Sequence, residues 1–314
     1  MTPLRVVSGS ANPALAAAVA ERLDADALGV VLERFPDGEI RPIVGHVSGQ
    51  DVYVVQPTAP PVNDNFVELL LLLDACRRSR AARVTAVVPY LGYSRQDRRT
   101  VSGQALGLRV VVEAIAGAGA ERLVVIDPHT PALESVSPIP VETLTAVPLL
   151  AERVSPVRGG DTVIVAPDAG AATLAERYAA ITGHSVALVR KYRENESSVS
   201  AIALLGDVRH RPAVIVDDMI CTGATIEAAV GMLLHHAADI VVAASHGPLA
   251  GAAHLHRLDV RRVLVTDTVA HAAVAPPFEV CSVAPLLAEA IARMHEDLPL
   301  HDLFAPARMG PRSA

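Results

Sequence analysis

The sequence predicts an α/β protein built from two doubly wound parallel-sheet domains of similar layout. Short runs of β-branched residues, such as those at 84–88 and 213–216, alternate with apolar stretches of helical length in both halves of the chain. Several runs end in turns rich in Gly, Pro and Asp, which are typical connections between the strands and helices of such sheets. No sequence repeat is evident, so the similarity of the two halves is one of layout alone.

Composition limits the classes of function. The 314 residues are enough for two domains, and with 51% hydrophobic and only 3% aromatic residues the core must consist of Ala, Val and Leu. A formal charge of -7 and a pI near 5.9 argue against a nucleic-acid partner, which would need a basic face. Three cysteines without CxxC spacing, no signal-peptide pattern at the start and no long apolar run favour a cytoplasmic protein with no membrane partner.

The first half contains the expected alternation of strands and helices. Strands are predicted at 4–7, 30–34, 52–55, 84–88 and 123–126, and helices at 13–23, 66–78 and 105–116. The helix at 66–78 has a wide apolar surface, so we expect it to be buried or to lie at a subunit contact.

Three loops of this half carry candidate site residues, each with a second interpretation. Phe35 in the turn 35–39 either stacks on a base or anchors the loop. Arg95, Arg98 and Arg99 form either a polyphosphate clamp or a solvated charge run. His129, just after a strand, is either a metal ligand or a structural hydrogen-bonding residue.

A Pro-rich stretch at 137–148 and a polar segment up to Gly160 predict a domain boundary, which gives domains at 1–145 and 146–314. The second half then resumes the alternation. Strands are predicted at 162–165, 186–189, 199–204, 213–216, 240–244 and 263–265, and helices up to 181, at 226–235 and at 284–294. The last of these helices can pack back on the first domain.

The stretch 214–225, VIVDDMICTGAT, has the strongest site pattern. Asp217 and Asp218 follow a buried strand, and a Thr- and Gly-rich turn, Thr222–Thr225, opens a helix. Such a turn offers N–H groups and hydroxyls to a phosphate, and paired carboxylates suit sugar hydroxyls or a hydrated divalent ion. The alternative is that the acids only cap the helix.

One residue count is unusual. The 27 basic side chains comprise 26 Arg and one Lys, and that single Lys191 lies in the polar loop 190–197. Because Arg meets the general need for positive charge in this chain, the lone Lys suggests a chemical role.

Six segments, in order, resemble the ribose-phosphate pyrophosphokinases, the enzymes that make phosphoribosyl pyrophosphate (PRPP). They are similar to the family's FSDGE loop, PTNDNLMELL helix, PYxGYxRQDRR motif, DLH segment, SPD segment and KRR loop, and here they read FPDGE (35–39), PVNDNFVELL (61–70), PYLGYSRQDRR (89–99), DPH (127–129), APD (166–168) and KYR (191–193). The stretch 214–225 resembles the PRPP signature that this family shares with the type I phosphoribosyltransferases.

The resemblance implies two phosphoribosyltransferase-like domains, an ATP-side domain at 1–145 and a ribose 5-phosphate domain at 146–314. The implied activity transfers diphosphate from MgATP to the anomeric hydroxyl of ribose 5-phosphate, giving PRPP and AMP. It also implies Mg²⁺ as cofactor and a homo-oligomer, a dimer or larger, in which the turn 35–39 serves a neighbour's site. The implied residues are Lys191 and Arg193 for catalysis; Phe35, Asp37, Gly38, Glu39, Arg95 and Gln96 for ATP; Arg193, Asp217, Asp218, Cys221, Thr222, Gly223, Ala224 and Thr225 for ribose 5-phosphate; and His129 and Asp168 for the metal.

The chain also departs from the family pattern. Many members have Asp where this chain has Cys221 and Gly where it has Ala224, and the stretch 130–142 lacks the Gln-Gly-Phe-Phe pattern of the ADP-regulated class. The segment 102–112 is more similar to the archaeal-type members, which escape ADP control. Two alternatives are a type I phosphoribosyltransferase, which would lack the whole first half, and a non-catalytic synthetase-associated subunit, which would have no reason to keep Lys191.

Overall fold

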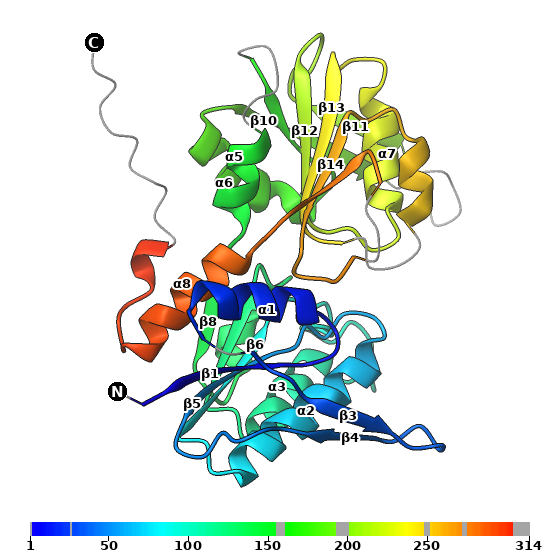
Figure 1. Cartoon of the computed structure of the whole chain (residues 1–314). Helices are drawn as coiled ribbons and strands as arrows, with labels where there is room; N and C mark the ends of the chain where they lie inside the picture. The colour runs from blue at the N-terminus through cyan, green and yellow to red at the C-terminus, as the bar shows by residue number, and fades with distance from the viewer. Residues whose placement is uncertain are drawn as a thin grey trace, which may run out of the picture. The chain divides into compact units, whose positions relative to one another are not determined.

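The computed structural model describes residues 2–25, 27–154, 161–192, 201–247, 252–271 and 275–303. The side chains of 191–192, 201–202, 252–254 and 302 are not described. The chain divides into two compact units (Figure 1). The first unit comprises Met1–Thr145, Thr268–Ala270 and Ser282–Ala314, and the second comprises Ala146–Asp267 and His271–Cys281.

The first unit is built on a six-stranded parallel sheet with the order β2-β1-β5-β6-β7-β8. Its strands are β1 (Leu4–Ser8), β2 (Ala27–Leu28), β5 (Asp51–Val55), β6 (Arg83–Val88), β7 (Arg122–Ile126) and β8 (Val141–Leu144). Helices α1 (Pro13–Arg22) and α8 (Ala284–His295) contact each other on one face, and α2 (Val62–Arg78) and α3 (Gly107–Ala118) do so on the other. Both faces are therefore covered, as a parallel sheet requires.

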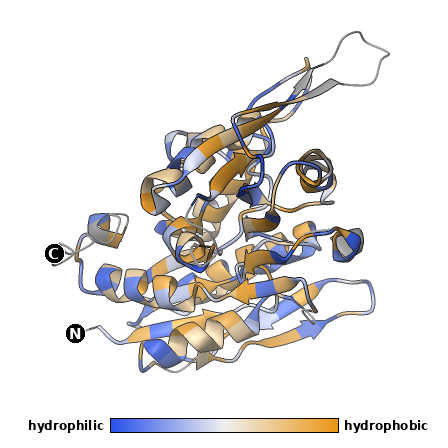
Figure 2. Ribbon diagram, turned by 90° about the horizontal axis from the view of Figure 1, so that it is seen from above, coloured by the Kyte–Doolittle hydropathy of each residue, from blue (hydrophilic) through white to orange (hydrophobic). Residues whose placement is uncertain are grey.

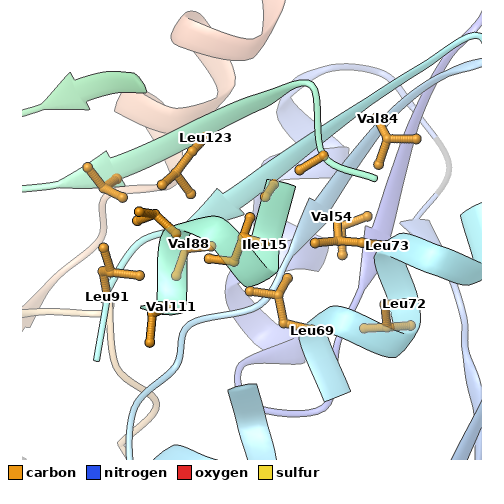
Figure 3. Packing of buried hydrophobic residues seen from close by; sticks show 14 of the residues in the cluster. Val54, Leu69, Leu72, Leu73, Val84, Val88, Leu91, Val111, Ile115 and Leu123 are labelled. Carbon is orange, nitrogen blue, oxygen red and sulfur yellow. The ribbon is translucent and has the colours of Figure 1, made fainter. Parts of the chain in front are cut away.

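The core of this unit lies between the central strands and the pair α2 and α3. Leu69 and Leu73 of α2 and Ile115 of α3 are fully buried against Val54 of β5 and Val88 of β6 (Figure 3). Every residue of β5 and all but the first residue of β6 are buried, and Figure 2 shows hydrophobic residues along the strands of the molecule. The dominance of Val, Leu and Ile agrees with the aromatic-poor composition.

A separate hairpin, β3 (Val31–Arg34) and β4 (Ile40–Ile43), forms a two-stranded antiparallel sheet. β4 packs against α2, and the turn between the two strands is the segment 35–39.

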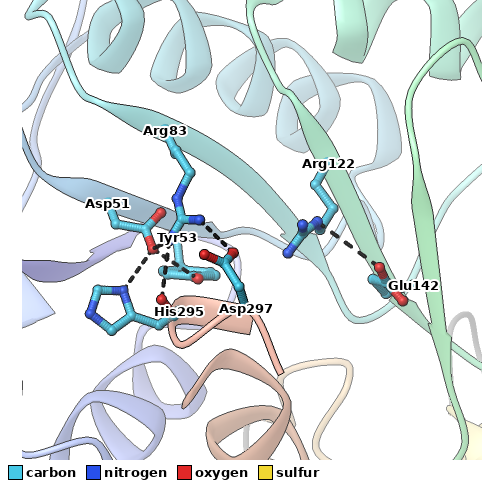
Figure 4. A network of polar contacts seen from close by, with 7 residues as sticks. All are labelled: Asp51, Tyr53, Arg83, Arg122, Glu142, His295 and Asp297. Carbon is cyan, nitrogen blue, oxygen red and sulfur yellow. Dashed lines mark hydrogen bonds and ion pairs between the residues drawn. The ribbon is translucent and has the colours of Figure 1, made fainter. Parts of the chain in front are cut away.

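A buried polar network joins α8 to the starting ends of two strands of the first unit (Figure 4). Asp51 is only 1% exposed, and its Oδ2 accepts hydrogen bonds from Tyr53 Oη at 3.1 Å, Arg83 at 2.6 Å and His295 Nδ1 at 2.7 Å. Arg83 also pairs with Asp297 at 2.9 Å and donates to the His295 carbonyl at 3.2 Å. Burial, and next the Asp51 charge, raises the pKa of Tyr53, so its hydroxyl remains a donor.

The second unit contains a seven-stranded sheet with the order β11-β10-β9-β12-β13-β14-β15, in which only the pair β10 and β11 is antiparallel. Its strands are β9 (Val163–Ala166), β10 (Ser185–Tyr192), β11 (Ala201–Leu205), β12 (Pro212–Met219), β13 (Asp239–His246), β14 (Arg262–Thr266) and β15 (Phe278–Cys281). Helices α5 (Val147–Val154) and α6 (Ala172–Thr182) lie on one face and α7 (Ala224–Leu233) on the other.

The predicted fold class is confirmed, with two differences in detail. The Pro-rich stretch is not a bare connection, because α4 (Ala132–Val136), β8 and α5 fall within 132–154. Asp217 and Asp218 lie inside β12 rather than after it, since the strand continues to Met219. Short 3-10 helices occupy Ala169–Ala171, Ala252–Arg257 and His301–Leu303. No helix in the described ranges is long and apolar enough to cross a bilayer.

Candidate active site

The connection from β12 to α7 forms a turn in the second unit whose geometry suits an anion. Gly223 precedes α7 with a φ of 87°, a left-handed conformation that residues with a side chain rarely adopt. Gly223 is the N-cap residue of α7 and has no side chain to cap the first turn. The N-cap position is thus occupied by Gly223 rather than by Asp217 or Asp218, and N–H groups at such a helix start suit a phosphate.

The two acids of β12 sit half-buried beside this turn. Asp217 Oδ1 accepts a hydrogen bond from the Asp218 N–H at 2.9 Å. Burial, and then the charges of Asp218 and Asp168, raises the pKa of Asp217 to about 8. The negative charge here is unfavourable in the free protein, so a ligand that brings hydroxyl donors or a cation would relieve it.

Asp168 reaches the same edge of the sheet from the neighbouring strand. β9 pairs with β12 in parallel, with Val165 opposite Ile215, so their carboxyl ends lie together. Asp168 follows β9, and its Oδ1 accepts hydrogen bonds from the N–H groups of Gly170 at 2.9 Å and Ala171 at 3.3 Å. One carboxylate is thus held rigidly in place at the edge that carries Asp217.

Hard oxygen donors of this kind suit Mg²⁺, which usually takes one or two carboxylates and completes its shell with water or substrate phosphate. In the described part of the chain, no three His, Cys, Asp or Glu side chains form a closed metal site. This donor set fits an open Mg²⁺ site better than a closed structural one. His129 is exposed after β7 and belongs to the first unit, whereas Asp168 belongs to the second.

β13 supports the turn between β12 and α7, a contribution that sequence reasoning missed. The Ile220 N–H donates to the carbonyl of His246 at 2.8 Å. Gly247 has a φ of 138°, and a Cβ there would lie 2.8 Å from the Ile220 carbonyl oxygen. The signal that could have revealed this support is the polar, Gly-terminated end of an apolar strand, Ser245-His246-Gly247.

Lys191 lies at the end of β10, opposite Ile202 of β11. β10 runs parallel to β9, with Leu188 opposite Ala166, so the backbone of Lys191 is three residues further toward the carboxyl edge that carries Asp168. The Lys191 side chain and Arg193 lie outside the described residues.

The predicted adenine-binding residues occupy the turn of the β3–β4 hairpin. The Phe35 N–H donates to the Glu39 carbonyl at 2.8 Å, Gly38 has a φ of 97°, and Asp37 Oδ1 accepts from the Glu39 N–H at 3.1 Å. The Phe35 ring is 39% exposed, with the Arg41 guanidinium 5.2 Å from its centroid. This hydrogen-bonded turn places a partly exposed aromatic ring beside Asp37 and Glu39.

Arg95 and Gln96 lie in the loop after β6, and both are exposed. The Gln96 carbonyl accepts the Leu108 N–H at 3.2 Å, and a Cβ on Gly107 would meet Gln96 Oε1 at 2.5 Å. The Gln96 side chain therefore lies against the start of α3. The structure thus groups the site residues by unit: the hairpin turn, Arg95, Gln96 and His129 in the first, and Asp168, Lys191, Asp217, Asp218 and Cys221–Thr225 in the second.

Comparison with known proteins gives matches along nearly the whole chain. Residues 4–119 match the N-terminal domain of ribose phosphate pyrophosphokinase, and residues 195–305 match the phosphoribosyl synthetase-associated domain. The ribose-phosphate pyrophosphokinase of Caldanaerobacter subterraneus is 37% identical, with 96% of this chain and 98% of the relative covered. The ribose-phosphate pyrophosphokinase of Rhodopirellula baltica is 38% identical, with 97% of this chain and 99% of the relative covered. The crystal structure of phosphoribosylpyrophosphate synthetase from Mycobacterium smegmatis superimposes with a TM-score of 0.88 at 33% identity, over 94% of this chain and all of that one. With relatives of this identity and coverage, the chain belongs to the ribose-phosphate pyrophosphokinase family.

Proposed function

We propose that this protein is a ribose-phosphate diphosphokinase, which makes PRPP and AMP from ribose 5-phosphate and ATP. The observation that carries the proposal is the edge of the second sheet, where Asp217 and Asp218 precede a turn in which Gly223 is left-handed and leads into α7. The acids match the hydroxyls of a ribose, and the turn matches its 5-phosphate. The presence of a full first unit favours a synthetase over a transferase that consumes PRPP.

Each of the two domains predicted from the sequence, 1–145 and 146–314, would bind one of the two substrates. Residues 146–314 would bind ribose 5-phosphate, with Asp217 and Asp218 accepting from the ribose hydroxyls and Cys221–Thr225 holding the phosphate. Thr222 and Thr225 add hydroxyl donors to the N–H groups of the turn. Neither Cys221 nor Ala224 removes an N–H group from this turn, so the departures from the family pattern leave its backbone donors in place.

Residues 1–145 would bind ATP. Phe35, Asp37, Gly38 and Glu39 would hold adenine, with Phe35 stacking on the base, while Arg95 and Gln96 contact the nucleotide. The exposed Phe35 ring in a hydrogen-bonded turn supports this role over that of a buried loop anchor.

The reaction joins the anomeric oxygen of ribose 5-phosphate to the β-phosphorus of ATP and breaks the bond between that phosphorus and the oxygen bridging to the α-phosphate. AMP leaves with the bond electrons, and the hydroxyl proton passes to solvent or to a nearby base. His129 and Asp168 are the proposed ligands of Mg²⁺, which would supply neutralisation of phosphate charge. Lys191 and Arg193 would stabilise charge that grows on the transferred group in the transition state.

We also propose a cytoplasmic homo-oligomer, a dimer or larger. Val67 and Leu71, one turn apart on α2, are 48% and 38% exposed. On the hairpin, the directly paired Val31 and Ile43 are 59% and 47% exposed. Apolar side chains in this number on one hairpin and the helix that it packs against support a subunit contact, which would place the hairpin turn 35–39 near a neighbour's site.

The test is to incubate the purified protein with ATP, ribose 5-phosphate and Mg²⁺ and to follow phosphorus NMR. We expect AMP and PRPP to appear in equal amounts, and neither without ribose 5-phosphate. The double variant Asp217→Asn/Asp218→Asn serves as the control for contaminating activity. Consumption of added PRPP with a purine or pyrimidine base would favour the transferase, and absence of both reactions would favour a non-catalytic subunit.

A further inference from the structure

The loop after β6 must hold its shape if Arg95 is to meet a nucleotide. Arg95 lies within a tight turn in which the Gln96 N–H donates to the Tyr93 carbonyl at 2.9 Å. Tyr93 itself has a φ of 64°, a left-handed conformation that a residue with a side chain disfavours. Such a conformation persists only where the surroundings impose it.

Thr58, in the loop between β5 and α2, is the buried residue that imposes it. Thr58 is only 1% exposed, and its hydroxyl both accepts and donates a hydrogen bond. Thr58 Oγ1 accepts the Gly92 N–H at 2.7 Å and donates to the Tyr90 carbonyl at 3.2 Å, while the Thr58 N–H donates to the same carbonyl at 2.9 Å. Three hydrogen bonds from one residue thus fix the backbone just before Tyr93.

The approach of the two loops is close. A Cβ on Gly92 would lie 2.8 Å from both the Thr58 carbonyl oxygen and Val62 Cγ1, so only Gly fits. Beyond Gly92 the loop is held at two more points, since the Tyr93 hydroxyl bonds to Asn63 Oδ1 and the Gln96 carbonyl accepts from α3. Arg95 therefore lies between points at which the loop is held, and the buried Thr58 hydroxyl is one of them.

We infer that Thr58 is a positioning residue for ATP, acting through the loop 90–96 that carries Arg95 and Gln96. The inference rests on the proposed function and assigns no contact between Thr58 and substrate. A valine at position 58 would keep the shape of the side chain but would leave the buried Gly92 N–H without an acceptor. The loop would then relax away from the strained Tyr93 geometry, and Arg95 would lose its fixed position.

The experiment compares Thr58→Val with Thr58→Ser, which keeps the hydroxyl, and with Thr85→Val, which removes a buried hydroxyl from β6 of the same unit. We expect Thr58→Val to raise the KM for ATP and the calorimetric Kd for ATP by about tenfold, the consequence of one unsatisfied buried donor. The KM for ribose 5-phosphate should stay within about twofold, because that substrate uses the other unit. Thr58→Ser and Thr85→Val should resemble the wild type.

A surface variant keeps the inference testable whatever the folding of Thr58→Val. Tyr93→Phe removes the hydroxyl contact with Asn63 at the exposed side of the same loop, and we expect a smaller rise in the Kd for ATP, about threefold. Equal changes for both substrates, no change in Thr58→Val, or failure of Thr58→Ser to restore ATP binding would each overturn the positioning role. If the wild type bound ATP but made no PRPP, the proposed function would fail, and the binding measurements would still decide the role of Thr58.

Discussion

Replacing Arg83 with Met should loosen the attachment of α8 to the first unit. Arg83 donates to the buried Asp51 carboxylate at 2.6 Å and to the carbonyl of His295 at the end of α8 at 3.2 Å. Asp51 Oδ1 has no hydrogen-bond partner among the described residues, so the charge of this carboxylate depends on what Oδ2 accepts. Removing the cation leaves a buried charge that only two neutral or titratable donors still stabilise.

The size of the effect follows from the exposure of each partner. Loss of one partner from a fully buried ion pair costs about 3–5 kcal/mol. The Arg83 side chain is 35% exposed, and Tyr53 and His295 continue to donate to Asp51, so we expect a smaller loss of about 2 kcal/mol. The bridge to Asp297 adds little, because Asp297 is 75% exposed. A loss of this size lowers the Tm of a unit of this length by about 4–8 °C.

Arg122 provides the matched control, since it is the first residue of the adjacent strand β7. It lies 4.0 Å from Glu142, and both side chains are about a third exposed, so Arg122→Met should cost no more than about 0.5 kcal/mol. Urea unfolding gives the free energies, and hydrogen exchange reports on α8 directly. Arg83→Met should speed exchange in residues 284–295 and Arg122→Met should not. Equal stability of the two variants, or unchanged exchange in α8, would refute the reasoning.

Three further predictions concern the site. Burial raises the pKa of Asp217 to about 8, so the folded state holds that proton more tightly than the unfolded state does. The free energy of unfolding therefore falls as pH rises from about 4 to about 8. Asp217→Asn should raise the Tm more at about pH 8.5 than at about pH 5, measured without Mg²⁺ or substrate. A Tm difference independent of pH would mean that Asp217 is not the group responsible. Lys191→Ala should keep its melting temperature and lose turnover by about 10²–10³, with Lys191→Arg recovering only part, because a guanidinium restores the charge without the geometry. Wild-type turnover in Lys191→Ala would remove this residue from the mechanism. ADP should inhibit only by competing with ATP, because residues 130–142 lack the pattern of the ADP-regulated class. Inhibition by ADP at saturating ATP, with a sigmoidal dependence of rate on ribose 5-phosphate, would contradict this.

The sequence predicted the strands that are rich in Val and Ile and bounded by turns, because burial on both faces leaves a continuous apolar run. It failed where Pro occurs in the first turn of a helix or at the edge of a sheet. Pro148 is the second residue of α5, a position where its missing N–H costs nothing. In the sequence it was interpreted instead as part of a Pro-rich connection between domains. Pro42 lies within β4, a short strand of a two-stranded sheet, which tolerates it.

In the site too, local sequence patterns predicted some features and contacts between distant residues could not be predicted. Local patterns predicted the turn at Thr222–Thr225 and the acids beside it, since a strand, its turn and the next helix are contiguous in sequence. The sequence suggested that the helix at 284–294 can pack on the first domain, but it could not predict the residues that attach it, because His295 lies 244 positions from its partner Asp51 and nothing in the local sequence of either residue marks the pair. Thr58 is similar: a lone Thr in a Pro-rich loop gives no sign of the Gly92 N–H that it accepts 34 positions later.

The placement of α8 bears on how the chain is made. During synthesis, the first 145 residues leave the ribosome as a sheet whose α1 face lacks the helix that α1 contacts in the finished protein. The whole second unit must be synthesised before residues 284–295 can cover that face and engage Asp51 and Arg83. Because one face of the first sheet is covered completely only when α8 is present, its apolar surface stays open to chaperones and to aggregation from the synthesis of residue 145 until residues 284–295 are made. A stalled or truncated chain that ends before Ser282 should therefore be a substrate for quality control even when its second unit is intact.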